Sequence, residues 1–163
     1  MPDGVTAAEL AAVLVHTLPI AGGASLTLIM LVNLWLAGRA VDLSHRLPRP
    51  WPDVPENLRL PRAVLVVFPI LIAGAALLDA YAGLFCAIAT AALAVPLTLQ
   101  GLAIVHVLTR RRPGRAAILV ALYVALLMLM PWSAILLTLL ALLDLAVSLR
   151  DRFAVAPSSP PQS

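Results

Sequence analysis

The sequence predicts an all-α fold, a polytopic helical membrane bundle of five transmembrane helices preceded by one short amino-terminal helix. Of its 163 residues 62% are hydrophobic and 12% are charged, about half the charged share of soluble domains. Several apolar runs approach or exceed about 18 residues, the length that crosses a hydrocarbon core of about 30 Å. Because these runs continue to residue 149, a secretory signal followed by a soluble domain is excluded.

The amino-terminal region contains two expected helices. Thr6 and Glu9 have the spacing of a capping box and predict a helix over 7–18 that stops before Pro19. Twelve residues rise only about 18 Å, too little to span. This helix therefore lies at the interface, re-enters the membrane, or continues as a kinked extension of the next helix. The following run, 20–38, is long enough for one crossing.

The polar segment 39–62 is an expected cytoplasmic loop. It contains LPRPWPDVPENLRLP, whose prolines disfavour helix and predict a semi-rigid extended segment at the membrane surface. Tryptophan and arginine suit the headgroup level, while the acids either pair with nearby arginines or dock a partner. The expected lipid or partner contacts are Arg49, Trp51, Asp53, Glu56 and Arg59.

Four further spans complete the expected single domain of residues 1–152. They cover 63–78, 84–109, 116–130 and 133–149, and a disordered tail over 153–163 follows. Pro96 should kink the second of these spans, either bordering a cavity or serving packing alone. Pro131 should divide the long last run into a hairpin, with a single kinked helix as the alternative.

The arginines set the expected orientation. All eleven cations are arginine, clustered in 39–62, in 110–115 and after residue 149. Cytoplasmic loops concentrate arginine, so an even number of crossings must separate these clusters. This favours the hairpin and places the amino terminus outside and the carboxyl terminus in the cytoplasm. The arginines punctuate apolar runs and form no basic stripe with aromatics, so no nucleic-acid partner is expected.

The sequence contains no strong catalytic or metal-binding motif. There is no glycine-rich phosphate loop, no HExxH, no GxSxG and no aspartate pair spaced for a metal. Cys86 is the only cysteine, so a metal site built on paired thiolates is excluded. We therefore expect a protein that is not an enzyme and has no cofactor or metal.

Polar residues inside the apolar runs are the main functional signal, because such residues are costly in lipid and usually face a bundle interior. Asn33, His106 and Asp144 lie about 6–9 Å inside their arginine boundaries, and Gln100 lies about 15 Å inside. They are predicted to line a polar cavity open to the cytoplasm. The alternative is interhelical hydrogen bonding that only holds the bundle together. The expected partners of Asp144 are His106 and an arginine near the boundary.

Four segments carry a family resemblance: NLWLAGR, RPWPDVPENLRLPR, GLAIVHVLTRRRPGR and MPWSAILLTLLALLDLAVSLRDR. Together they resemble the YybS-like family of predicted bacterial membrane proteins, in its alphaproteobacterial form, over roughly residues 30–152. Members of that family usually have additional amino-terminal spans, so this chain is similar to their carboxyl-terminal part or to a shortened member.

The resemblance implies a transport role. The family is distantly similar to the substrate-binding membrane subunits of energy-coupling-factor transporters, although it has no settled activity and no ligand residue is carried over. We therefore expect a transport-related, small-molecule-binding subunit of a bacterial inner membrane. The alternative is a non-catalytic membrane scaffold. The expected partners are the lipid bilayer, a small molecule and other membrane subunits.

Overall fold

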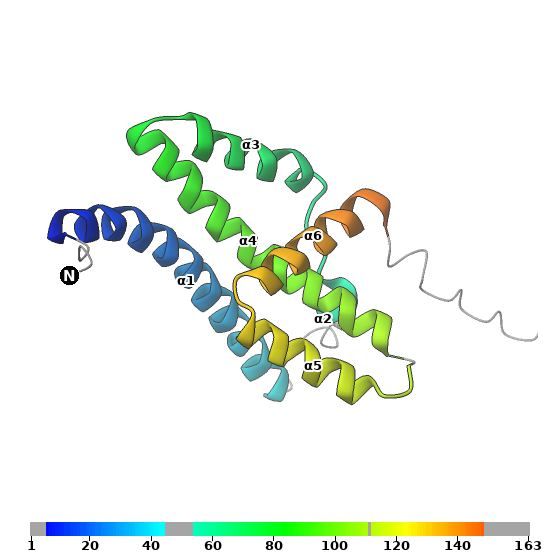
Figure 1. The fold of residues 1–163 in the computed structure, drawn as a ribbon. Helices are drawn as coiled ribbons and strands as arrows, with labels where there is room; N and C mark the ends of the chain where they lie inside the picture. Colours follow the sequence, from blue (N-terminus) through cyan, green and yellow to red (C-terminus); the bar gives the residue numbers. More distant parts are fainter. Residues whose placement is uncertain (1–5, 45–53, 111, 149–163) are drawn as a thin grey trace, which may run out of the picture. The chain divides into compact units, whose positions relative to one another are not determined.

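Helices are the only regular elements in the described part of the chain. The computed structural model describes residues 6–44, 54–110 and 112–148, and the expected all-α class is confirmed over these ranges. The helices are α1 (Ala7–Leu43), α2 (Val54–Asn57), α3 (Val64–Leu77), α4 (Ala80–Thr109), α5 (Arg115–Met128) and α6 (Trp132–Val147) (Figure 1). They form two compact units. The first contains α1, α3 and α4 up to Leu97, and the second contains α2, α4 from Thr98, α5 and α6.

Helix α1 joins the amino-terminal segments 7–18 and 20–38 into one helix, which is one of the three arrangements expected for residues 7–18. The predicted capping box is confirmed, since the Thr6 N–H donates to the Glu9 carboxylate at 2.8 Å and the Glu9 N–H donates to the Thr6 hydroxyl at 3.3 Å. The helix does not stop before Pro19 but continues through it. Proline removes one helical hydrogen bond, whereas a helix end within an apolar run would leave up to four carbonyls without partners. Continuation into the next helix is thus the observed form of residues 7–18.

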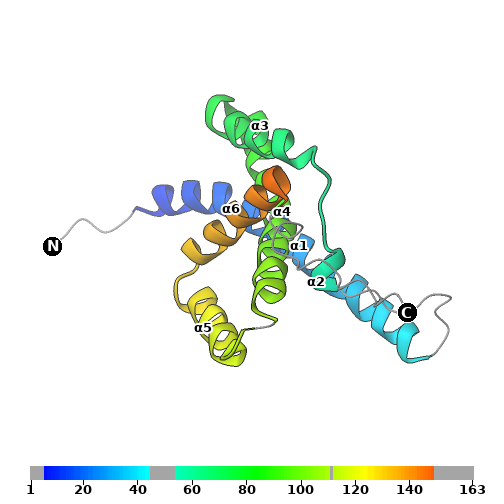
Figure 2. The ribbon, with the colours of Figure 1, turned by 90° about the vertical axis from the view of Figure 1, so that its right-hand side faces the viewer.

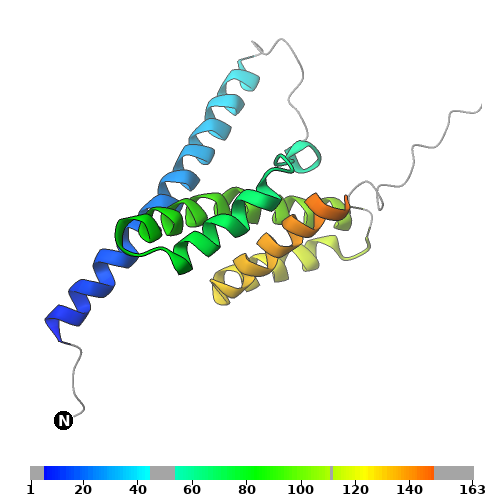
Figure 3. The ribbon, with the colours of Figure 1, turned by 90° about the horizontal axis from the view of Figure 1, so that it is seen from above.

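A two-residue turn links α3 to α4, in place of the longer turn and the later start at residue 84 that were expected. Helix α3 ends at Leu77 and α4 begins at Ala80. Gly83 makes this possible, because a Cβ there would lie 2.2 Å from the Leu78 carbonyl oxygen. The chain can therefore reverse sharply, and α3 runs back beside the first half of α4 (Figures 1 and 3).

The segment between α1 and α3 contains a short helix, where an extended form was expected. Helix α2 spans Val54–Asn57, with Pro55 as its second residue. Proline is tolerated in the first turn of a helix, because the N–H that it lacks would have no helical partner there. The expected extended form is therefore wrong for these four residues. Three of the expected lipid or partner contacts, Arg49, Trp51 and Asp53, lie outside the described residues, as does the tail 153–163.

The last apolar run forms two helices, α5 and α6, and not one kinked helix. Helix α5 ends at Met128, and α6 begins at Trp132 directly after Pro131. Proline has no N–H for the helical ladder, so the chain turns at this point (Figure 2). The Ser133 hydroxyl donates to the Leu126 carbonyl at 3.4 Å and links the two arms across the turn.

Two helices are long and apolar enough to cross a membrane, α1 with 37 residues and α4 with 30. Their lengths are about 55 Å and about 45 Å at 1.5 Å per residue. Helices α3, α5 and α6 are apolar but have only 14, 14 and 16 residues, or about 21–24 Å. The expected spans over 63–78, 116–130 and 133–149 therefore correspond to helices shorter than an average hydrocarbon core, which can cross only where the bilayer is thinned.

The second unit is built around a close crossing of α4 and α6. Its buried apolar side chains include Ala103 and Ile104 from α4 and Ala141 from α6. At the crossing, a Cβ on Gly101 would lie 2.1 Å from the Leu137 carbonyl oxygen. Because no side chain fits there, glycine lets the two backbones approach, as small residues do between membrane helices.

We predict that Gly101→Ala destabilises the protein by about 1–3 kcal/mol, because the added methyl group forces the two helices apart. Thermal unfolding of the detergent-solubilised protein, followed by circular dichroism, measures the change. The matched control is Gly22→Ala in α1, where nothing lies within 4 Å of an added Cβ and alanine favours the helix by up to about 1 kcal/mol. Equal stability of Gly101→Ala and wild type would contradict the close crossing.

Candidate functional site

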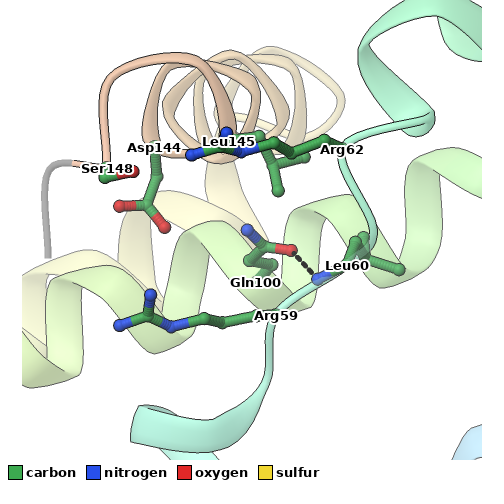
Figure 4. Close-up of a pocket in the computed structure, with 7 residues that line it drawn as sticks. All are labelled: Arg59, Leu60, Arg62, Gln100, Asp144, Leu145 and Ser148. Carbon is green, nitrogen blue, oxygen red and sulfur yellow. Dashed lines mark hydrogen bonds between the residues drawn. The ribbon is translucent and has the colours of Figure 1, made fainter. Parts of the chain in front are cut away.

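A pocket in the second unit collects polar side chains from three elements. It has a volume of about 140 Å³ and is formed by the loop after α2, by α4 and by α6 (Figure 4). The lining residues are Arg59, Leu60, Arg62, Gln100, Asp144, Leu145 and Ser148. Two guanidinium groups, one carboxylate and one carboxamide therefore border one small cavity.

Gln100 forms the contact that holds the loop against α4. Its side chain is 0% exposed, and its Oε1 accepts a hydrogen bond from the Leu60 N–H at 2.9 Å. Its Nε2 has no hydrogen-bond partner among the residues that the structure describes. A buried donor without a partner costs about 1–3 kcal/mol. The pocket wall therefore carries one polar group whose hydrogen-bonding capacity is unused.

Asp144 contributes the carboxylate from α6 and is 6% exposed. A buried carboxylate stays ionised only where positive charge or hydrogen-bond donors compensate for the loss of water. Arg59 and Arg62 line the same pocket, and in Figure 4 their side chains extend below and above the space between Asp144 and Gln100. The expected arginine neighbourhood of Asp144 is thus present, whereas His106 does not line the pocket.

Contacts between α4 and α6 hold the walls of the pocket in place. The Thr98 and Thr138 hydroxyls are 3.1 Å apart and hydrogen-bonded across the two helices. They lie two residues before Gln100 and six residues before Asp144 in their respective helices. Helix α6 ends at Val147, and the N–H of the next residue, Ser148, donates to the Asp144 carbonyl at 2.8 Å. The backbone that carries Gln100 and Asp144 is therefore held in place by these neighbouring hydrogen bonds.

The other two residues of the predicted polar layer lie elsewhere. Asn33 is exposed on α1, in the first unit. His106 is half-buried, with Nδ1 2.9 Å from the Leu102 carbonyl oxygen and Nε2 3.4 Å from the Tyr123 hydroxyl. Because a carbonyl only accepts, Nδ1 donates to Leu102, and Nε2 lies within hydrogen-bonding distance of the Tyr123 hydroxyl. His106 thus links α4 to α5, which is the interhelical role that was the alternative for this layer.

The remaining sequence candidates serve the loop and the helix backbone. Glu56 on α2 forms an ion pair with Arg110 at the end of α4, and such exposed pairs contribute about 1 kcal/mol or less. Arg59, expected at the lipid surface or a partner, is exposed but also lines the pocket. Pro96 lies within α4, which continues across it, and it does not line the pocket.

No family model, curated protein or solved structure matches the chain. Within residues 6–44, 54–110 and 112–148, no group of three or more His, Cys, Asp or Glu side chains is placed to hold a metal ion. What the pocket offers chemically is charge pairing and hydrogen bonding by arginine, carboxamide and carboxylate.

Sequence reasoning missed part of the pocket lining, above all Arg62 and the Leu60 backbone. Depth along each helix identified Gln100 and Asp144, but it carries no information on how a loop folds back onto a helix. The available signal was that Arg59 and Arg62 are the last two cations before the next apolar run, which is the same kind of charged boundary from which the depth of Asp144 is counted.

We predict an energetic coupling of about 0.5–1.5 kcal/mol between Thr98→Val and Thr138→Val. Valine keeps the shape of threonine and removes the hydroxyl. Each single change already breaks the interhelical hydrogen bond, so the double variant should be destabilised by less than the sum of the two single changes. A double-mutant cycle on unfolding in detergent measures the coupling.

Thr90→Val is the matched control, because the Thr90 hydroxyl donates to the Cys86 carbonyl of its own helix at 2.7 Å. Combined with Thr138→Val, it should show additive effects. Additivity of the Thr98 and Thr138 changes would argue that their hydroxyls do not hold the two helices together.

Proposed function

We propose that the protein is a multi-pass membrane protein that holds a small polar molecule in the pocket of Arg59, Arg62, Gln100 and Asp144. In this proposal it is a non-catalytic, transport-related subunit of a bacterial inner membrane, with its carboxyl terminus in the cytoplasm. The transport role and the bacterial membrane rest on the resemblance to the YybS-like family. The ligand site rests on the pocket.

The apolar surface supports a membrane location. Helices α1 and α4 are long enough to cross, and no residue of α1 is buried. Large side chains such as Met30 and Leu34 are each 71% exposed. Soluble monomers rarely leave contiguous apolar surface of this extent in water, whereas a lipid environment stabilises it. The arginines of residues 59–62 and 110–115 belong on the cytoplasmic side by the positive-inside rule.

The single observation that carries the ligand site is the juxtaposition of a buried carboxylate and a buried carboxamide in one cavity. Polar side chains within membrane helices are costly and mark ligand or ion pathways when they face a cavity. Asp144 and Gln100 do so from two different helices, with two arginines opposite. A structural hydrogen bond between helices needs no cavity, so this arrangement favours binding over packing alone.

A scaffold that binds other membrane subunits is the second candidate. It is favoured by helices α1 and α5, neither of which has a buried residue. Either lipid or the helices of another protein can cover these faces. The scaffold function requires that another protein covers them.

We predict that Asp144→Leu removes a bound small molecule, because the pocket loses its carboxylate. The measurement is native mass spectrometry of the full chain purified in mild detergent. The affinity should fall at least about tenfold, corresponding to a loss of about 1.4 kcal/mol of binding free energy, and the occupancy should fall with it. Asp144→Asn keeps the shape of the side chain and decides the question if the leucine variant does not fold.

Asp79→Asn is the matched control, since Asp79 is exposed in the turn before α4 and should leave occupancy unchanged. Retention of the molecule at wild-type occupancy by a folded Asp144→Leu protein would contradict the ligand site. A wild-type protein that carries no small molecule but co-purifies with another membrane protein would favour the scaffold.

We predict that the turn before α4 and the loop after it lie on opposite sides of the membrane, because α4 is about 45 Å long. Single cysteines are placed by Tyr81→Cys, Trp132→Cys and Arg112→Cys in a Cys86→Ser background. A membrane-impermeant maleimide should label positions 81 and 132 in intact spheroplasts, and position 112 only after permeabilisation. If position 132 behaved like position 112 and was labelled only after permeabilisation, the two-crossing hairpin of α5 and α6 would be contradicted.

A further inference from the structure

We infer that the group bound in this pocket is a phosphate group, carried either by a lipid headgroup or by a soluble phosphate compound. This inference rests on the proposed ligand site and names the chemistry of its ligand. It is drawn from the buried, unused donor of Gln100, the charge balance of the lining and the size of the cavity.

The unused donor has a fixed direction. The Oε1 of Gln100 accepts from the Leu60 N–H at 2.9 Å. Exchanging the oxygen and nitrogen of the amide would set two donors against each other, so the assignment of the two atoms is determined by this bond. The Nε2 must then point away from Leu60, and Figure 4 shows it turned into the pocket on the side of Asp144. A group with an acceptor oxygen is required to satisfy it.

The charge of the lining favours an anion. Arg59, Arg62 and Asp144 are the charged residues of the pocket, so one positive charge is in excess. Guanidinium groups present several N–H donors in a plane and are favoured wherever phosphate or carboxylate oxygens are bound. Arg62 is exposed and none of the described ion pairs involves it, which leaves its donors available to a ligand.

The number of donors favours phosphate over carboxylate. The Arg62 guanidinium and the Gln100 amide come from a loop and from a helix and reach the cavity from different sides (Figure 4). A phosphate group offers three or more oxygens in tetrahedral directions, whereas a carboxylate offers two in one plane. The cavity of about 140 Å³ exceeds the roughly 10–15 Å³ that a single water needs, so several heavy atoms fit.

Asp144 determines which functional group of the ligand can lie next to the phosphate. Its carboxylate only accepts hydrogen bonds and would repel a second anion. Beside the phosphate that faces Arg62 and Gln100, the bound molecule therefore places a hydroxyl or an ammonium group near Asp144, which already takes part in an interaction within the protein. Phosphate esters of small alcohols and amines have this pattern, both as free compounds and as lipid headgroups.

The test is Gln100→Glu, which keeps the shape of the side chain and the acceptor for Leu60 but replaces the unused donor by an oxygen. Arg62→Gln is the second variant, and since Arg62 is exposed its loss does not endanger the fold. The control is Arg112→Gln, which removes the same charge from the exposed loop between α4 and α5. Each full-length protein is purified in detergent.

Two probes separate the sources of the phosphate. Glycerol phosphate in solution is titrated against the protein by calorimetry, and phosphatidylglycerol is compared with diacylglycerol, which lacks the phosphate, as a retained adduct in native mass spectrometry. Binding of either probe should weaken at least about tenfold in Gln100→Glu and in Arg62→Gln and stay unchanged in Arg112→Gln. Preference for the soluble compound identifies a free phosphate ester, and preference for the lipid identifies a headgroup. Both results support the inference.

Wild-type protein that binds neither probe, or Gln100→Glu and Arg62→Gln variants that bind as well as wild type, would overturn the inference. Such a result leaves the proposed function intact if a different small molecule is retained and is lost on Asp144→Leu. If the wild-type protein retains no molecule and binds neither probe, both proposals fail. The two failures are therefore distinguishable within one set of preparations.

Discussion

The second unit of this protein depends on one backbone contact, the approach of the Leu137 carbonyl to Gly101. A helix pair separated by side chains on both faces could not come this close. The approach brings Thr98 within hydrogen-bonding distance of Thr138 and sets Gln100 and Asp144 on facing walls of the same cavity. The close crossing of α4 and α6 and the arrangement of the pocket walls thus both depend on the absence of a Cβ at Gly101. Small residues have the same role where helices cross in membranes.

The helical class and most helix locations follow from the length of the apolar runs and from the arginines between them. The turn at Pro131 was predictable because proline cannot donate and because placing the arginine clusters on one side of a membrane leads to the expectation of an even number of crossings. Pro19 and Pro55 show where this reasoning fails. Proline is found inside α1 and in the first turn of α2. Its effect on a helix depends on which neighbouring carbonyl loses its hydrogen-bond partner and on whether water can replace that partner.

The candidate site was predictable only in part, for a related reason. Counting residues from a charged boundary estimates depth in a helix, and it identified Gln100 and Asp144 as inward-facing groups. Depth along a helix does not specify the direction in which a side chain points. The sequence alone therefore could not distinguish Asn33 and His106, which lie outside the pocket, from Gln100 and Asp144. His106 is satisfied by Leu102 and Tyr123, and Arg62 reaches the pocket through a loop whose path no periodicity encodes.

The contact between the loop and α4 has a consequence for how the pocket tolerates change. Gln100 holds the loop by the main-chain N–H of Leu60 and not by the leucine side chain. The hydrogen bond that holds the loop can therefore form with any residue at position 60 that has an N–H, while the Leu60 side chain contributes to the lining of the pocket. Nineteen of the twenty amino acids meet this condition and proline alone does not. The next position, 61, is already proline, so a shift of the loop that brought position 61 opposite Gln100 would offer no donor, whereas a shift toward Arg59 would. The main chain thus excludes one of the two single-residue shifts of the loop against α4.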